Sequence, residues 1–175
     1  MIVGISGRMG SGKDTVAKII KNNFTEKDFV ITHFADPLKR FCMDYLGLSY
    51  DDVYTENGKK KFNYFWGMTN REILQKVGTN ALRNGFDKDI WVKIMKIQLV
   101  RYKNILIPDV RFDNEAQLIL QEKGIVLNVQ RDCSTNDKHV SESGISEKFI
   151  TKNILNNGTL NDLEKEVVCF LKDNI

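Results

Sequence analysis

Residues 2–15 read IVGISGRMGSGKDT, and this stretch decides the fold of the chain. Its apolar start, Ile2 to Ser6, is bounded by glycine and predicts a buried β-strand. The pattern G-x-x-x-x-G-K of a phosphate-binding loop follows from Gly7 to Lys13. A helical period of apolar residues begins after the lysine, so strand, loop and helix come in the order that such a loop requires. The sequence therefore predicts a phosphate site at the end of the first strand.

The chemistry of the loop supports this interpretation. A glycine-rich turn that leads into a helix offers a phosphate several backbone N–H groups and the positive end of the helix dipole. Its glycines let the backbone approach closely, and Lys13 adds a charge for the β- and γ-phosphates of a nucleotide. The candidate ATP-binding residues of the loop are Gly7, Arg8, Met9, Gly10, Ser11, Gly12, Lys13, Asp14 and Thr15.

The residue after the lysine departs from the general pattern. Asp14 stands where a hydroxyl normally binds magnesium, and Thr15 follows one place late. The sequence GSGKDT resembles the GKGT variant of nucleoside monophosphate kinases, in which a threonine is also late. Asp14 could hold the metal through water, anchor an arginine, or be an acid favoured by the helix dipole. These three interpretations stay open.

Strand-like and helical segments alternate along the rest of the chain. This alternation predicts a three-layer α/β fold, with a five-stranded parallel sheet covered by helices on both faces, and 175 residues suggest a single domain, 1–175. We expect residues 48–68 to be an irregular insertion or mobile flap within a helical acceptor-side region, 48–103, and residues 131–146 to be a lid. The further expected strands are 29–34, 104–108, 125–130 and 149–155, and the further helices are 36–46, 69–82, 87–102, 112–123 and a last one that Thr159 or Asn161 caps.

Charged residues follow two of the predicted strands, at the sheet edge where ligands bind in such folds. Asp109 follows NILIP, where a Walker-B acid positions magnesium, and Arg111 could bind two phosphate oxygens. Alternatively, Asp109 caps the next helix and Arg111 pairs with Glu115. Arg131 begins the polar lid, which also carries His139.

Polar residues elsewhere could contact an acceptor. Asp36 and Lys39 follow the second strand, and amide, hydroxyl, arginine and aromatic groups on the middle helices could bind a base edge and a phosphate. Surface polar groups and a core tryptophan are the alternative. The residues of the middle helices are Gln75, Thr79, Arg83 and Trp91.

Composition narrows the class of protein. A net charge of +3 is too small to indicate nucleic-acid binding, although it suits small anionic ligands. The N-terminus has no basic leader, and its apolar run is too short for a membrane segment. Cys42, Cys133 and Cys169 lack metal-ligand spacing and are expected to be reduced thiols. We therefore expect a cytoplasmic protein that binds neither nucleic acid nor membranes.

The motifs together resemble the deoxynucleoside monophosphate kinases of bacteriophages. The resembling segments are SGRMGSGKDT, FADPLKRF, LQKVGTNALRNGFDKDIWVK, PDVRFDNEAQLILQEKGIVLNVQR, DKHVSESGI and FITKNILNNGTLNDLEKEV. The resemblance implies a P-loop kinase fold and phosphorylation of a deoxynucleoside monophosphate (dNMP) to the diphosphate (dNDP), with ATP and Mg²⁺. Residues 48–68 are shorter than in many members, which bears on base specificity.

The resemblance also implies roles for residues. Lys13 would neutralise the ATP phosphates, Arg111 would hold the acceptor phosphate, and Arg131, with Asp14, completes the expected catalytic set. Arg131 and His139 would join the loop in binding ATP. Asp14, Thr15 and Asp109 would hold Mg²⁺, directly or through water. Asp36, Lys39, Gln75 and Thr79 would line the acceptor side beside Arg111. The further candidate acceptor residues are Arg71, Arg83, Trp91 and Glu115.

Two other functions are compatible with the sequence. One is another small P-loop kinase, similar to dephospho-coenzyme A kinase, whose hydroxyl acceptor would need an acidic base such as Asp14 or Asp36. The other is a nucleotide-binding module without turnover. A monomer and a homodimer are both open as the state of assembly.

Overall fold

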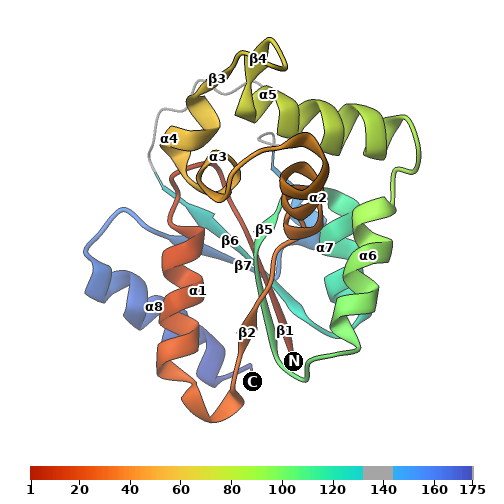
Figure 1. Cartoon of the computed structure of the whole chain (residues 1–175). Coiled ribbons are helices and arrows are strands. Elements are labelled where there is room, and N and C mark those ends of the chain that lie inside the picture. Colours follow the sequence, from red (N-terminus) through yellow and green to blue (C-terminus); the bar gives the residue numbers. More distant parts are fainter. Residues whose placement is uncertain (132–143, 175) are drawn as a thin grey trace. The chain divides into compact units, whose positions relative to one another are not determined.

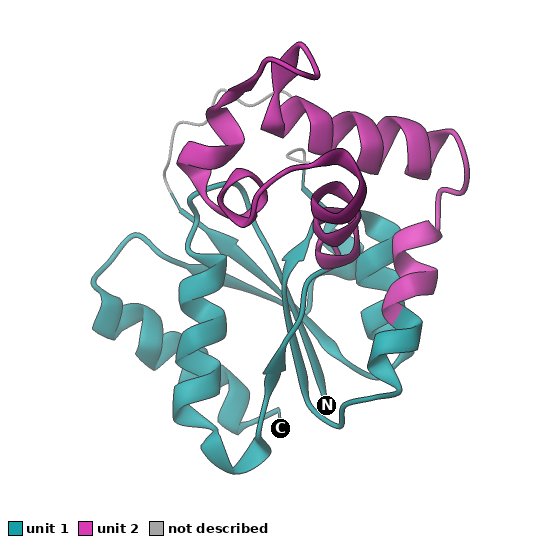
Figure 2. Cartoon of the chain, viewed as in Figure 1, with its two compact units in different colours: residues 1–33, 96–175 teal, residues 34–95 magenta. Residues whose placement is uncertain are grey.

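The computed structural model describes residues 1–131 and 144–174, and the chain divides into two units (Figures 1 and 2). Unit 1 comprises residues 1–33 and 96–175, and unit 2 comprises residues 34–95. Among the described residues, no helix has both the length and the apolar character needed to cross a membrane.

Unit 1 is built on a parallel sheet with the strand order β2-β5-β1-β6-β7 (Figure 1). The first strand of the chain therefore lies at its centre, hydrogen-bonded to β5 on one side and to β6 on the other. All four strand pairs are parallel, which confirms the predicted five-stranded sheet. The strands are β1 (Ile2–Ser6), β2 (Val30–Ile31), β5 (Ile105–Val110), β6 (Ile125–Gln130) and β7 (Lys152–Leu155).

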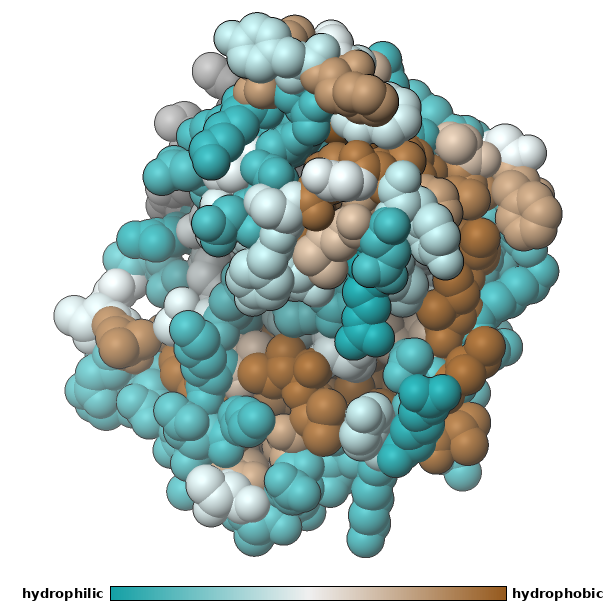
Figure 3. Space-filling model, viewed as in Figure 1, coloured by the Kyte–Doolittle hydropathy of each residue, from teal (hydrophilic) through white to brown (hydrophobic). Residues whose placement is uncertain are grey.

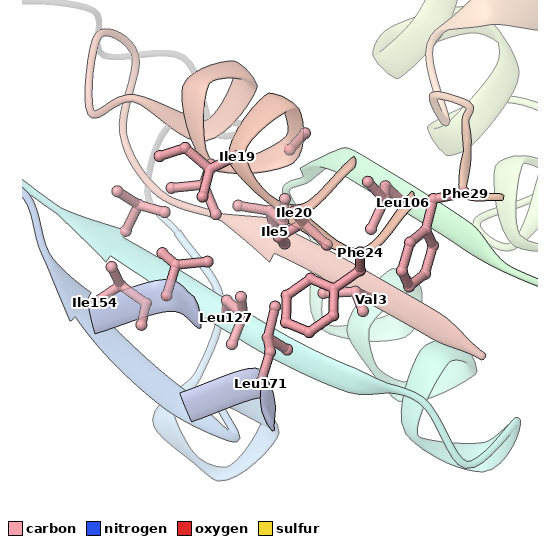
Figure 4. Packing of buried hydrophobic residues seen from close by; sticks show 14 of the residues in the cluster. Val3, Ile5, Ile19, Ile20, Phe24, Phe29, Leu106, Leu127, Ile154 and Leu171 are labelled. Carbon is pink, nitrogen blue, oxygen red and sulfur yellow. The ribbon is translucent and has the colours of Figure 1, made fainter. Parts of the chain in front are cut away.

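Helices cover both faces of this sheet. Val3 and Ile5 of β1 belong to a buried apolar cluster on the face covered by α1 (Lys13–Asn23) and α8 (Leu160–Lys172) (Figure 4). The residue between them, Gly4, faces α7 (Asp113–Gln121), where a Cβ at this glycine would lie 2.4 Å from Ile119 Cδ1. Successive residues of a strand point to opposite faces, so β1 packs against helices on both sides. The three-layer prediction is confirmed.

A bulge in β5 changes the predicted end of that strand. Gly4 pairs with Ile107 and Ser6 pairs with Val110, so three steps along β5 match two along β1. Pro108 lacks the N–H that a regular ladder would use, and such strands bulge rather than pair evenly. As a result Asp109 lies within the strand, half-buried, instead of following it. The alternative in which Asp109 caps the next helix is wrong.

Other boundaries differ by a few residues from the sequence predictions. The strand expected at 29–34 is reduced to Val30–Ile31, and among the described residues this edge strand pairs with β5 alone. The helix expected at 87–102 is α6 (Ile90–Leu99), whose residues belong partly to each unit. Thr159, not Asn161, caps α8.

Unit 2 contains the segment expected to be irregular, and that expectation is wrong. Residues 48–68 form two short helices and the greater part of a hairpin. A capping box of Ser49 and Asp52 starts the first helix, and the Thr55 hydroxyl caps the second. Gly58 permits their contact, since a Cβ there would lie 1.9 Å from the Asp51 carbonyl oxygen.

The remaining elements of unit 2 surround a small apolar core of its own, formed by Cys42, Leu48, Val53 and Ile73. The helix expected at 69–82 begins as predicted, with Thr69 and Glu72 as its capping box, but continues as a π-helix over Lys76–Asn84. The elements are α2 (Asp36–Leu46), α3 (Tyr50–Tyr54), α4 (Glu56–Lys60), β3 (Phe62–Asn63), β4 (Met68–Thr69) and α5 (Asn70–Gln75). The visible face of the molecule mixes hydrophilic residues with smaller hydrophobic patches (Figure 3).

The cap of α8 predicts an acid-sensitive stability. The side chain and backbone N–H of Thr159 both donate to Asp162 and hold the pKa of that carboxyl below its usual range. A carboxyl whose pKa is lower in the folded state stabilises the fold above its unfolded pKa and loses that contribution as pH falls. We expect Asp162→Asn to flatten the fall in unfolding free energy between about pH 5 and pH 2, measured by urea denaturation. Equal slopes for wild type and Asp162→Asn would contradict the assignment.

Candidate active site

The loop between β1 and α1 takes a backbone conformation that depends on its three glycines. Gly7, Gly10 and Gly12 have φ angles of 141°, 79° and 105°, in the region that side chains disfavour. A Cβ on Gly7 would also lie 2.4 Å from the Val129 carbonyl oxygen, so the loop passes close against β6. Lys13, the first residue of α1, reaches back across the loop and donates to the carbonyl oxygens of Gly7 (2.7 Å) and Arg8 (2.8 Å). The lysine ammonium is thus held over the loop.

The residues of the loop fit a phosphate group. The N-terminus of the 11-residue helix α1 and the Lys13 ammonium both favour an anion there. The Ser11 hydroxyl is buried and has no hydrogen-bond partner within residues 1–131 and 144–174. Apart from Met9, Gly10 and Ser11 themselves, no heavy atom of the described residues lies within 4 Å of the position that a Cβ on Gly10 would take. The loop thus offers an anion a positive charge, a hydroxyl that needs a hydrogen-bond partner, and open space beside Gly10.

The carboxylates near the loop suit a magnesium ion that a nucleotide carries. Asp14 is exposed on the first turn of α1, Thr15 is half-buried beside it, and Asp109 lies in the bulge of the neighbouring strand β5. Within the described part of the chain, no three His, Cys, Asp or Glu side chains cluster as metal ligands. Mg²⁺ usually keeps several waters and takes one or two carboxylates plus substrate phosphates, so a dedicated cage is not required.

Arg111 is the first residue after β5, and Glu115 positions its backbone. The Glu115 side chain is 2% exposed and accepts hydrogen bonds from the N–H groups of Arg111 (2.9 Å) and Phe112 (3.2 Å). These bonds close the turn from β5 into α7. Glu115 stays a predicted acceptor-binding residue, and its two hydrogen bonds to the backbone also position the turn beside Arg111.

Removing this buried carboxylate is expected to destabilise the protein. Glu115→Ala should lower the unfolding free energy by about 1–3 kcal/mol, because two N–H groups of the turn lose their acceptor. Urea denaturation measures the loss, and Glu122→Ala, at the exposed C-terminal end of α7, is the matched control. Equal stability of the two variants would show that the turn does not depend on the carboxylate.

The predicted lid begins and ends at described residues of unit 1. Arg131 follows β6 directly and is exposed. At the other end, Ser146 donates from its backbone N–H (2.8 Å) and hydroxyl (2.6 Å) to the Asp113 carboxylate at the start of α7. Burial alone would raise the pKa of Asp113, but these bonds, with Lys148 nearby, outweigh it and leave the pKa lowered. Residues 132–143, including His139, lie outside the described residues.

In unit 2, the structure brings Asp36 and Lys39 together around a tyrosine. The Tyr54 hydroxyl donates to Asp36 Oδ1 (3.2 Å), and Lys39 Nζ lies 4.2 Å from the centre of the Tyr54 ring. Lys39 Nζ is also 3.9 Å from Asp36 Oδ1. Burial and the negative charge of Asp36 raise the pKa of Tyr54 to about 12, so the ring keeps its proton at neutral pH. Sequence reasoning missed Tyr54, which lies in the segment read as irregular.

Other predicted acceptor residues are occupied by contacts inside unit 2. Trp91 is buried and donates from its indole N–H to the Gly78 carbonyl (3.1 Å), the contact expected of a core tryptophan. Arg71 forms an ion pair with Glu56 at 2.7 Å. Arg83 is 7% exposed and donates to the Lys88 carbonyl (3.3 Å). Gln75 ends α5, and Thr79 lies with Arg83 in the π-helix, an element often found at functional sites.

The sequence analysis also missed Asn156, which contacts the phosphate loop. Its side-chain amide donates to the Ser11 carbonyl oxygen at 2.7 Å, although the two residues lie 145 positions apart. Its position in the sequence could have identified it, because Asn156 follows β7 directly, at the sheet edge where the other motifs lie. Asn156 also begins the short connection from β7 to α8.

Known proteins resemble this chain in sequence and in fold. Residues 55–167 match the deoxynucleotide monophosphate kinase family. A protein of Acanthamoeba polyphaga mimivirus named for this activity is 31% identical over 96% of this chain and 94% of its own length. The deoxynucleoside-5'-monophosphate kinase of Escherichia phage T5 is 26% identical over 97% and 95%.

The structural likeness extends to solved structures of low sequence identity. Shikimate kinase from Aquifex aeolicus superposes with a TM-score of 0.56 at 13% identity, covering 99% of this chain and 98% of its own. TT1252 from Thermus thermophilus has a TM-score of 0.52 at 18% identity, covering 100% and 98%. These likenesses show the P-loop kinase fold, while the match to the sequence family covers more than half of the chain. The chain belongs to the deoxynucleotide monophosphate kinases, a family of phosphotransferase enzymes.

Proposed function

We propose that this enzyme transfers the γ-phosphoryl group of ATP to a deoxynucleoside monophosphate in a magnesium-dependent reaction. The products are ADP and the deoxynucleoside diphosphate, and the setting is the cytoplasm. The observation that carries the proposal is the phosphate loop at the end of the central strand, where Lys13 reaches across to the Gly7 and Arg8 carbonyls. Family membership supplies the class of acceptor.

The acceptor chemistry suits a site of cations without a strong general base. The attacking phosphate monoester is already an anion at neutral pH, so no proton must be removed from an unactivated hydroxyl. The enzyme has to bring two polyanions together and neutralise the transferred group. In our proposal Lys13 binds the ATP phosphates, Arg111 binds the acceptor phosphate, and Arg131 approaches the transferred group from the lid.

The metal has candidate ligands at the start of α1 and within the neighbouring strand β5. Asp14 and Thr15 at the start of α1, and Asp109 in the bulge of β5, would hold Mg²⁺ or its waters. When bound, Mg²⁺ supplies neutralisation of the charge on the β- and γ-phosphates. The three protein groups would orient the waters that Mg²⁺ keeps. Asp36 and Lys39, paired around Tyr54, are the proposed polar contacts for the acceptor nucleotide.

An ADP-release assay with a substrate panel tests this function. The panel contains the four common dNMPs, the matching ribonucleotides and dephospho-coenzyme A, each with Mg²⁺ and with EDTA. We expect ADP formation that requires both a dNMP and the metal. Activity with dephospho-coenzyme A alone would replace the proposal by a hydroxyl-directed kinase. ATP binding without ADP release from any acceptor would show a module without turnover.

A further inference from the structure

We propose that Asn156 is a positioning residue that orients the phosphate loop for ATP. Its amide Nδ2 donates to the Ser11 carbonyl oxygen at 2.7 Å, and a Cβ on Gly12 would lie 2.4 Å from the same nitrogen. The asparagine side chain therefore lies directly against the peptide that joins Ser11 to Gly12. The inference rests on the proposed function, because it concerns the ATP side of that site.

The planar peptide explains how this contact acts on a ligand. In a trans peptide the C=O and N–H groups point in opposite directions. The bond to the Ser11 carbonyl thus turns the Gly12 N–H away from Asn156. That N–H is one of the backbone donors that a loop of this kind offers to phosphate.

Asn156 is itself held in place by the sheet. Its backbone N–H donates to the Gln130 carbonyl (2.8 Å), so it continues the ladder between β6 and β7 by one residue. The side chain therefore extends from a fixed point. Gly12 has a φ of 105° and could rotate easily, as glycine does. The Ser11 hydroxyl has no partner in the described parts of the chain, so it does not orient this peptide.

The consequence is specific to the phosphates. Without the Asn156 amide, the peptide between Ser11 and Gly12 can turn, and the Gly12 N–H must be oriented again when ATP binds. The free energy of this ordering weakens the binding of ATP and of any other polyphosphate in the loop. It does not affect the binding of the acceptor nucleotide. If Asn156 instead contacted the base of ATP directly, its removal would weaken the binding of ATP and leave the binding of a plain polyphosphate unchanged.

The test is equilibrium binding to the full chain by calorimetry, with ATP and inorganic tripolyphosphate as separate probes in Mg²⁺. We expect Asn156→Ala to weaken both by about tenfold, the loss of one well-formed hydrogen bond. Asn156→Asp keeps the shape and the backbone bond to Gln130 but loses the donor, and should weaken both at least as much. Asn153→Ala is the matched control, since Asn153 on β7 is exposed and its side chain accepts hydrogen bonds from the Asn128 and Gln130 side chains.

Kinetics and stability separate positioning from a merely structural role. In Asn156→Ala the KM for ATP should rise about tenfold, while the KM for the dNMP stays within about twofold. Unchanged affinity for both probes in the alanine and aspartate variants, or a lower melting temperature with normal affinity, would overturn the inference. So would weaker binding of ATP with normal binding of tripolyphosphate.

The inference and the proposed function fail in different ways. If the wild type binds both probes but forms no ADP with any dNMP, the proposed function is refuted, and the binding of the variants still decides the role of Asn156. A wild type that binds neither ATP nor tripolyphosphate would overturn both.

Discussion

Lys13→Ala is expected to lower kcat by about a thousandfold while the protein stays folded. The ammonium lies over the loop, 2.7 Å and 2.8 Å from two of its carbonyl oxygens, where it can meet the β- and γ-phosphates. Charge that develops on these oxygens during transfer is neutralised by groups already in place, and removing one such group typically costs a factor of 10² to 10³. The loss should therefore appear in turnover more than in acceptor binding.

Steady-state kinetics with saturating dNMP measures this effect, and circular dichroism checks the fold. Lys18→Ala is the matched control, because Lys18 is an exposed lysine of the same helix. Lys13→Arg should restore little, since the planar guanidinium does not replace a compact ammonium that fits between two carbonyl groups. Turnover of Lys13→Ala within about tenfold of wild type would refute the role of this lysine.

Arg111→Ala is expected to lower kcat/KM for the dNMP by about 10²- to 10³-fold. Arg111 directly follows β5, and its backbone N–H is fixed by the buried Glu115 carboxylate at 2.9 Å. A guanidinium held in this way can bind two oxygens of the acceptor phosphate at once. The KM for ATP should change little, because the phosphate loop is intact.

The two substrates must be varied separately to see this difference. Arg111→Lys should recover only part of the loss, since an ammonium cannot form the paired bonds of a guanidinium. Arg101→Ala, an exposed arginine just before β5, is the control for loss of one positive charge. A rise in the KM for ATP with an unchanged KM for the dNMP would place Arg111 on the donor side and contradict the assignment.

Much of unit 1 was predictable because its signals are local. The glycines, Lys13 and the apolar run before them lie within residues 2–15, and the central strands β1, β5 and β6 are short, mostly apolar segments. Strand ends were less predictable. The bulge that places Asp109 inside β5 depends on how Pro108 meets the partner strand β1, which the sequence of β5 alone does not show.

Unit 2 shows why composition can mislead. Residues 48–68 are rich in charged, aromatic and turn-forming residues, and they lack a long helical period. Two helices of five residues each form there because Ser49 and Thr55 cap them and Gly58 lets them meet. Helices this short gain most of their stability from packing, so the local sequence pattern predicts them poorly.

The sequence by itself determined that this chain carries a phosphate loop on a parallel α/β sheet, because a strand, a glycine-rich loop and a helix in succession have one stable arrangement. Only the tertiary structure decided what holds that loop and its neighbouring turn. Asn156 reaches Ser11 from 145 residues away, and Glu115 turns inward to the backbone at Arg111. Both contacts depend on which strand ends the fold brings to one edge of the sheet, and that order is set by packing between distant segments.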